Sequence, residues 1–225
     1  MNAASAGTVL VTGGTLRLGK AISDALRDRG MRVLTSSHRS GSGADIIVDL
    51  SEPSGPARLY LEAMRLAPDI SAIVNNAAVF TGDAGTMRAV NLDAPMKLTM
   101  MLAGKEDRPC AVVNVLDAEI IGSDAIPDDG SEKSLYLRTK RELMEYTRKS
   151  ACLFAGTLRV NAVAPGAVLA PVDVHEKAGE TLLAQRPSPE DVADAVAYLI
   201  EARSVTGTVI PVDSGRHLLS GDRAC

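Results

Sequence analysis

The order of apolar and polar residues divides the chain into short strand-like runs and longer stretches with helical spacing. Leu18, Ile22, Ala25 and Leu26 show that spacing, and Gly30 ends the stretch they belong to. Strands are predicted at Gly7–Val11, Met31–Thr35, Asp45–Val48, Ile70–Val74, Ala111–Leu116, Thr157–Val163 and Thr208–Val212. Helices are predicted at Leu16–Arg29, Ala57–Leu66, Met87–Leu102, Lys133–Phe154 and Pro189–Arg203. This alternation predicts an α/β fold, a single domain over residues 1–225 with one doubly wound parallel sheet of about seven strands flanked by helices.

The connection between the second and third predicted strands is short for this architecture. It consists of the residues around Ser37–Ala44. Parallel neighbours usually need about a dozen residues or more to return, often as a helix. The pattern therefore leaves two interpretations: the crossing is an extended loop, or the third strand is misplaced.

Composition narrows the classes of function and location. Of the 225 residues, 46% are hydrophobic and 3% aromatic, so small and branched aliphatic side chains must pack the core. The net charge of −4 argues against a nucleic-acid partner. No apolar run approaches the ~20 residues of a membrane span, and the N-terminal MNAASAG lacks the basic region of a signal peptide. We therefore expect a cytoplasmic protein with no membrane partner, whose cysteines are reduced: Cys110, Cys152 and Cys225.

A glycine-rich turn, TGGTLRLG at Thr12–Gly19, connects the first predicted strand to the first helix. Gly13 can take a tight turn without a Cβ penalty, and Gly19 lets the helix approach the sheet. The start of the helix then offers free N–H groups and positive dipole character to a diphosphate. The turn is predicted to bind a dinucleotide through Gly13, Thr15, Arg17, Leu18 and Gly19.

The residues after the second predicted strand favour NADPH over NADH. A carboxylate there would bind the ribose 2′-OH of NAD and repel a 2′-phosphate, but this chain has His38, Arg39 and Ser40 instead. Arg39 can form a forked contact with a phosphate, and Arg17 can add a second. Asp49, with Leu50, is a candidate adenine contact, although Asp49 can equally cap the segment that follows it.

Tyr136 and Lys140 stand four residues apart in a predicted helix, so their side chains share one face. A tyrosine with a pKa near 10 is a poor acid–base catalyst at neutral pH. A nearby ammonium, helped by the positive charge of an oxidised nicotinamide, is expected to lower that pKa. Tyr136 can then give a proton to the substrate while the cofactor gives a hydride.

Together these motifs resemble the short-chain dehydrogenase/reductase family over essentially the whole chain. The matching segments are TGGTLRLG, Asn75–Ala78, Asn91 in NLDAP, Tyr136-x-x-x-Lys140, Asn161–Gly166 and VTGTVIPVDSG. The resemblance implies a Rossmann-type fold and a homotetramer with the Lys133–Phe154 helix at one interface. It also implies that Asn91 helps to hold a water relay to Lys140. Cofactor contacts are implied for Asn76, Ala77, Ala78, Tyr136, Lys140, Pro165 and Gly166.

Three departures from the general family pattern resemble its pteridine reductase branch. Arg17 stands where the family usually has glycine, and Asp117 where it has a catalytic serine. Phe80 follows NNAAV where those enzymes stack a pterin ring, and such a ring would gain from an aromatic surface. Phe80 can also be loop packing, and Asp117 can be a turn cap rather than an acid that passes a proton to Tyr136. Ser123 is an alternative partner for Tyr136, because its spacing is closer to the family's usual one.

The leading hypothesis is an NADPH-dependent reductase of a pterin or folate-like dihydro substrate. Its catalytic residues would be Tyr136, Lys140, Asp117 and Asn91, and its substrate contacts Phe80, Arg17 and Asp117. A carbonyl reductase of the 3-oxoacyl-thioester type is the nearest alternative, and a non-catalytic NADPH-binding protein is a third. His38, His175 and His217 show no metal-ligand spacing, so no metal is expected.

Overall fold

The computed structural model describes residues 7–105, 110–122, 125–168 and 181–219, and it contains one sheet of seven strands. The order across the sheet is β3-β2-β1-β4-β5-β6-β7, and all six neighbouring pairs are parallel. The order reverses beside β1, which confirms the doubly wound, Rossmann-type α/β fold. The strands are β1 (Thr8–Thr12), β2 (Val33–Ser37), β3 (Ile46–Ile47), β4 (Ile70–Asn75), β5 (Cys110–Val115), β6 (Leu158–Pro165) and β7 (Val209–Val212).

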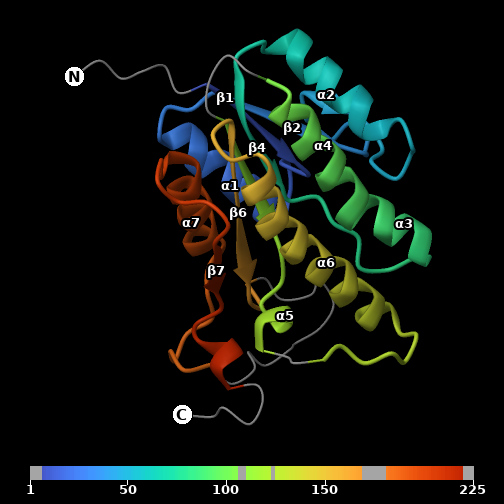
Figure 1. The fold of residues 1–225 in the computed structure, drawn as a ribbon, viewed down its shortest axis with the longest axis vertical. Coiled ribbons are helices and arrows are strands. Elements are labelled where there is room, and N and C mark those ends of the chain that lie inside the picture. The colour runs from blue at the N-terminus through green and yellow to red at the C-terminus, as the bar shows by residue number, and fades with distance from the viewer. Residues whose placement is uncertain (1–6, 106–109, 123–124, 169–180, 220–225) are drawn as a thin grey trace.

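Helices cover both faces of the sheet, with α2, α4 and α6 on one side and α1 and α7 on the other (Figure 1). The helices are α1 (Arg17–Asp28), α2 (Gly55–Leu66), α3 (Ala84–Arg88), α4 (Ala94–Ala103), α5 (Glu119–Gly122), α6 (Glu132–Leu153) and α7 (Pro189–Glu201). A π-helical segment, η1 (Ala89–Asp93), joins α3 to α4, and a 3₁₀ turn, η2 (Arg216–Leu218), follows β7. None of the described helices is long and apolar enough to cross a membrane.

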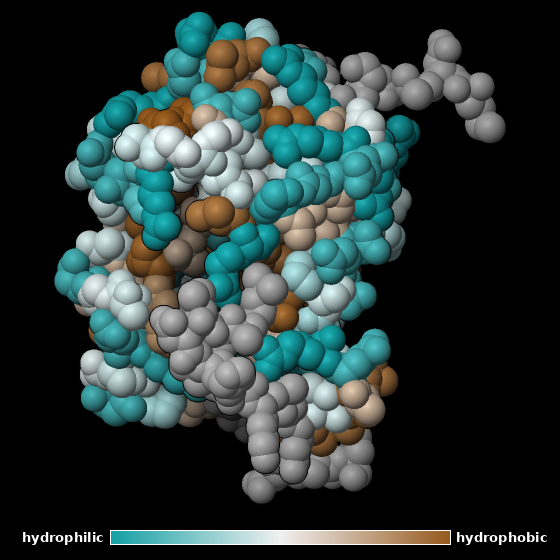
Figure 2. Space-filling model, turned by 180° about the vertical axis from the view of Figure 1, so that it is seen from behind, coloured by the Kyte–Doolittle hydropathy of each residue, from teal (hydrophilic) through white to brown (hydrophobic). Residues whose placement is uncertain are grey.

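Alternate residues of the central strands feed two separate hydrophobic layers. In β4, Ile73 packs under α2 and α4, while its neighbour Val74 packs under α1 and α7. Val112 and Val113 divide in the same way in β5. Both faces are covered, which explains why these strands are continuous apolar runs rather than alternating ones. On the side opposite to the view of Figure 1, hydrophilic residues predominate and hydrophobic ones gather near a central hollow (Figure 2).

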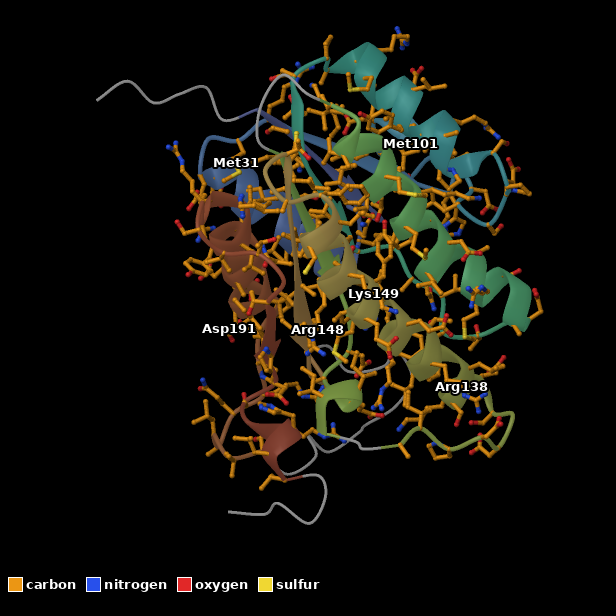
Figure 3. The ribbon with its side chains drawn as sticks, viewed as in Figure 1. Met31, Met101, Arg138, Arg148, Lys149 and Asp191 are labelled. Atoms are coloured by element: carbon orange, nitrogen blue, oxygen red, sulfur yellow. The ribbon has the colours of Figure 1, made fainter. Side chains whose placement is uncertain are left out.

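The longer helices α6 and α7 begin at side-chain caps that bind backbone N–H groups of the first turn. At α6, Ser131 Oγ accepts from the Ser134 N–H at 3.2 Å. At α7, Ser188 Oγ accepts from the N–H of Asp191, and the Asp191 carboxylate accepts in return from the N–H of Ser188. Asp191 lies in the first turn of α7 (Figure 3). This reciprocal capping box fixes where α7 starts.

The structure settles the short crossing and corrects one predicted helix. The third strand is correctly placed but short, and it is reached from β2 by a loop without a helix. The uninterrupted helix expected at Met87–Leu102 is wrong, because η1 interrupts it. The helical region also starts earlier, where Asp83 caps α3 by accepting from the Thr86 N–H. The sequence patterns did not reveal α5 or η2, which are too short for a periodic signal.

Candidate active site

The glycine turn between β1 and α1 is so tight that side chains would not fit at several positions. Gly13 has φ +62°, in the left-handed region. A Cβ at Gly19 would lie 2.0 Å from the Gly13 carbonyl oxygen. A Cβ at Gly14 would lie 2.8 Å from Thr35 Cγ2, so Gly14 is also required, a role that the sequence analysis missed. The glycines therefore allow the close packing that brings the start of α1 against the end of β1, where helix N–H groups can bind a diphosphate.

Asn76, directly after β4, fastens this turn from the neighbouring strand. Its Nδ2 donates to the carbonyl oxygens of Thr12 and Gly13 at 3.0 and 3.2 Å. Thr12 Oγ1 accepts in turn from the backbone N–H groups of Asn76 and Ala77, each at 3.0 Å. Asn76 thus shapes the glycine turn as well as lying beside it, and its contact with a cofactor remains a prediction. Ala78 is exposed and follows in the same loop.

Arg17 adopts an unusual backbone conformation at the start of α1. Its φ is +49°, and apart from Ser214 it is the only non-glycine residue with positive φ in the described part of the chain. The family commonly has glycine at this position, and holding an arginine there costs on the order of 1 kcal/mol. The side chain is exposed, at the mouth of the glycine turn near Thr15 and Leu18. Strain retained at this place supports a functional reason for the guanidinium.

The end of β2 carries basic and hydroxyl side chains, as predicted. His38, Arg39 and Ser40 are all exposed, and the Ser36 carbonyl oxygen accepts from the Gly14 N–H at 3.3 Å, so they follow directly beside the glycine turn. Arg39 Nε lies 3.4 Å from His38 Nε2. This local positive character is suited to a phosphate.

Asp49, after β3, forms a cap with its own chain. Its Oδ1 accepts from the N–H and the Oγ of Ser51 at 2.8 and 2.7 Å, and these bonds hold its pKa below the usual value. The capping interpretation is confirmed, whereas an adenine contact remains a prediction. Leu50 is buried in the core, so a cofactor contact there would come from its backbone.

Tyr136 meets Asp117 and Phe80 at the carboxyl end of the sheet. Tyr136 Oη donates to Asp117 Oδ2 at 3.3 Å, and the rings of Phe80 and Tyr136 are 5.0 Å apart at 57°. Phe80 is 51% exposed, so it does not serve only as loop packing. Asp117 Oδ1 also accepts from the Glu119 N–H at 2.9 Å. Asp117 therefore caps a turn with one oxygen and faces the tyrosine with the other.

The pKa values of Tyr136 and Asp117 are both raised above their usual values. Burial, and then the adjacent Asp117 carboxylate, raise the pKa of Tyr136 well above 10. The lowering expected from Lys140 together with an oxidised nicotinamide remains a prediction, and in the protein without cofactor burial and Asp117 set the direction. Burial also raises the pKa of Asp117. Tyr136 is thus a protonated hydroxyl at neutral pH, the form that a proton donor needs.

Lys140 is almost completely buried beneath the tyrosine. Its Nζ lies 5.6 Å from the centre of the Tyr136 ring and donates to the Val115 carbonyl oxygen at 2.8 Å. Burial lowers the pKa of Lys140 to about 8, although the Asp117 charge acts in the opposite direction. The spacing of four residues predicted that Lys140 and Tyr136 share one face of the helix, and the structure places the Lys140 ammonium beside the Tyr136 ring.

Asn91 lies in the π-helical segment η1 and binds the loop that carries Phe80. Its side chain accepts from the Val79 N–H and donates to the Val79 carbonyl oxygen, both at 2.8 Å. It also donates to Thr139 Oγ1 at 3.3 Å, next to Lys140 on α6. π-helical turns are frequent at functional sites because they redirect a side chain. The water relay itself remains a prediction.

Pro165 ends β6, and Gly166 follows it and lines a pocket with residues from the end of β7, which the sequence did not reveal. A Cβ at Gly166 would lie 2.8 Å from the Cβ of Asp213, so glycine is needed here for close approach. Asp213 and His217 follow β7 and line a pocket of about 250 Å³ together with Asp117. The motif VDSG hinted at this region, but nothing in the sequence placed it against Asp117.

Other expected residues stand apart or lie outside the described ranges. Cys110 is buried and Cys152 exposed, and no disulfide joins these two described cysteines. Among the described residues no three acidic, histidine or cysteine side chains form a group able to hold a metal. Ser123, His175 and Cys225 lie outside the described residues, so the alternative partner for Tyr136 stays open.

Comparison with known proteins assigns the family. A family model described as enoyl-(acyl carrier protein) reductase matches residues 18–217. The chain therefore belongs to this family of short-chain dehydrogenases/reductases, and it is an oxidoreductase. Dihydromonapterin reductase from Shigella boydii serotype 4 (strain Sb227) is 25% identical over 240 residues, covering 93% of this chain and 96% of that protein. The protein of the same name from Citrobacter koseri is 26% identical over 238 residues, with the same coverage.

Solved structures resemble the fold across its whole length. The FolM alternative dihydrofolate reductase 1 from Brucella canis, complexed with NADP, matches with a TM-score of 0.83 at 29% identity and covers 98% of both chains. The protein of the same name from Brucella suis, also in complex with NADP, matches with a TM-score of 0.80 at 29% identity, covering 94% of this chain and 95% of that one.

Proposed function

We propose that this member of the short-chain dehydrogenase/reductase family reduces a pterin or folate-like dihydro substrate with NADPH. The observation that carries the proposal is the grouping of Phe80, Asp117 and Tyr136. A half-exposed aromatic ring lies 5.0 Å from the ring of the predicted proton donor, which itself contacts a carboxyl group. A flat heteroaromatic ring can stack on Phe80 while its ring nitrogen faces Tyr136. The names of the relatives from Shigella, Citrobacter and Brucella support the same substrate class.

The residues present fit NADPH on structural grounds. A Cβ at Gly14 or Gly19 would collide with Thr35 or with the Gly13 carbonyl oxygen, so only glycine permits this tight turn at the start of α1. Arg39, Ser40 and His38 would hold the 2′-phosphate directly after β2, where the chain has these residues in place of an acid. When bound, NADPH supplies the hydride. The two similar Brucella structures are complexes with NADP, which supports this choice.

The side chains of the site would supply the proton that accompanies hydride transfer. Tyr136 Oη would donate its proton to the substrate. Asp117, whose pKa burial raises, would take up a proton from solvent and pass it from Oδ2, 3.3 Å away, to the phenolate, which restores the Tyr136 hydroxyl. Lys140 would favour the transient phenolate, because its ammonium lies against the same ring. Asn91 would hold the Phe80 loop against α6 through Val79 and Thr139. The intact set of Tyr136, Lys140 and Asn91 argues against a non-catalytic NADPH-binding protein.

The test is an assay panel on the purified protein. NADPH and NADH are each offered with dihydrobiopterin, dihydrofolate and acetoacetyl-CoA, and oxidation of the cofactor is followed by absorbance. We expect turnover of the pterin substrates with NADPH, and its loss in Tyr136→Phe. Turnover of acetoacetyl-CoA alone would establish the carbonyl reductase instead. Unchanged activity in Tyr136→Phe would refute the catalytic assignment.

We also propose a cytoplasmic homotetramer built from single-domain subunits over residues 1–225, with α6 at one interface. Exposed apolar side chains on neighbouring helices support this assembly: Leu153 of α6 is 74% exposed and Met100 of α4 is 51% exposed. Such residues are common at interfaces. Light scattering on the full chain should give four times the subunit mass, and a monomer would refute it.

A further inference from the structure

A pocket of about 250 Å³ lies beside Asp117, on the side where the loops after β5, β6 and β7 meet the start of α6. Its volume is below the ~300–1,000 Å³ that sites for whole drug-sized ligands occupy. It is therefore large enough for part of a substrate, not for all of it. Because Asp117 lies at its edge, a group in this pocket would be attached to the ring that stacks on Phe80.

Most charges that line the pocket already have partners. Glu119 pairs with Lys133 at 2.8 Å. Asp213, which is 3% exposed, accepts from the Gly215 N–H, the His217 N–H and His217 Nδ1. Arg216 differs: its half-buried guanidinium has no hydrogen bond or ion pair with any residue that the structure describes. A cation held without a partner in a pocket is suited to an anion brought by a ligand.

The turn that carries Arg216 is rigidly built. Ser214 has φ +56°, a strained conformation for a non-glycine residue, and Gly215 follows with φ +79°. The bonds to Asp213 hold this turn from inside, and the Leu183 N–H donates to the Ser214 carbonyl oxygen at 3.0 Å from outside. Strain persists only where surrounding contacts fix it, so the fold fixes the backbone from which Arg216 extends.

We propose that this pocket receives the side chain of the reduced pterin, and that Arg216 selects substrates whose side chain carries a carboxylate, as in dihydrofolate. The inference rests on the proposed function and adds the residue that sets substrate preference. Lys133 and Glu119 neutralise each other, Asp213 is satisfied within its own turn, and Asp117 accepts from the Glu119 N–H and from Tyr136 Oη. The Arg216 guanidinium is therefore the lining charge that is left to bind an anion brought by a ligand.

The test compares two substrates that differ in the charge of the side chain. Dihydrofolate carries carboxylates, and dihydrobiopterin carries a neutral hydroxylated chain. In Arg216→Gln, KM for dihydrofolate should rise about 10-fold to 100-fold, the value of one charge-assisted bond, with kcat little changed. KM for dihydrobiopterin should change by no more than about 2-fold, because less than ~0.5 kcal/mol is involved. Arg216→Lys should recover part of the dihydrofolate affinity.

Arg203→Gln is the matched control. Arg203 is exposed and precedes β7, so it lies toward the opposite end of that strand, and its loss should affect neither substrate. p-Aminobenzoyl-glutamate, which is the side-chain portion alone, should inhibit the wild type competitively and Arg216→Gln much less. This inhibition tests the pocket even if Arg216→Gln folds poorly.

The outcomes separate the two proposals. If the wild type reduces neither substrate, the proposed function fails. If it reduces dihydrobiopterin but p-aminobenzoyl-glutamate does not inhibit, the role of Arg216 is overturned while the function stands. Equal changes for both substrates in Arg216→Gln, or no change for either, would overturn it as well.

Discussion

Replacing Lys140 by methionine should stabilise the fold while abolishing activity. Lys140 is 2% exposed, and burial lowers its pKa from 10.5 to about 8. A lowered lysine pKa means that the folded state disfavours the ammonium. The charge therefore costs stability whenever it is present, and the protein retains it for the reaction.

The magnitude follows from the pKa. Lowering the pKa from 10.5 to about 8 is a change of about 2.5, and at ~1.4 kcal/mol for each pH unit the buried ammonium costs about 3.5 kcal/mol. Methionine fills similar space but removes the donor to the Val115 carbonyl oxygen, a loss of about 1 kcal/mol. The net gain at pH 7 is about 2.5 kcal/mol, equivalent to roughly 5–10 °C in Tm.

The pH dependence has a definite sign. Below pH 8 both folded and unfolded chains carry the proton at Lys140, so the full cost applies. Between about 8 and 10.5 the unfolded state binds more protons than the folded one, so wild-type stability gains from this group as pH rises. Lys140→Met should lack that contribution. Above 10.5 neither state carries the charge, and the cost vanishes.

Urea unfolding of the wild type and Lys140→Met at pH 7 and pH 9.5 measures both effects. Lys149→Met is the control, because Lys149 lies on the same helix (Figure 3) with its side chain 80% exposed and should change stability by less than about 0.5 kcal/mol. A less stable Lys140→Met at pH 7 would refute the reasoning, as would a difference from the wild type that does not shrink at pH 9.5. Retained reductase activity would refute the role of Lys140.

Three further predictions concern the glycine turn after β1 and the contact between Asp117 and Tyr136. Arg17→Gly should relieve the left-handed strain and stabilise the fold by up to about 1 kcal/mol in urea unfolding, while it raises KM for NADPH. Equal KM values for the wild type and the variant would show that Arg17 does not bind the cofactor. Gly19→Ala should abolish NADPH binding, measured by cofactor fluorescence, because its Cβ would lie 2.0 Å from the Gly13 carbonyl oxygen; normal binding would contradict the role of the glycine turn. Asp117→Asn removes a charge that raises the pKa of both Tyr136 and Lys140, so the alkaline limb of the pH profile of kcat/KM should move to lower pH. An unmoved limb would show that Asp117 does not influence the ionisation of Tyr136 and Lys140 during the reaction.

Local patterns were enough to predict the features that depend on neighbours along the chain. The strands, the tight turn at Gly13 and Gly19, and the shared face of Tyr136 and Lys140 follow from backbone geometry and residue spacing. The resemblance to a reductase branch added Phe80 and Asp117 as candidates. It left open whether each was functional or ordinary packing.

Tertiary structure decided what depends on residues far apart in sequence. The exposed ring of Phe80 lies beside Tyr136 in a loop that Asn91 binds to α6 through hydrogen bonds to Val79 and Thr139. The raised pKa of Tyr136 comes from burial and Asp117, which no spacing reveals.

The pocket with Arg216 exists because parallel strands end at one edge of the sheet, and that edge brings together loops about a hundred residues apart. The sequence by itself therefore determined the fold and the class of reaction, since both rest on local spacing. The tertiary structure decided that Tyr136 meets Phe80 and Asp117, and it supports the proposed choice of substrate, since both rest on which loops share that edge.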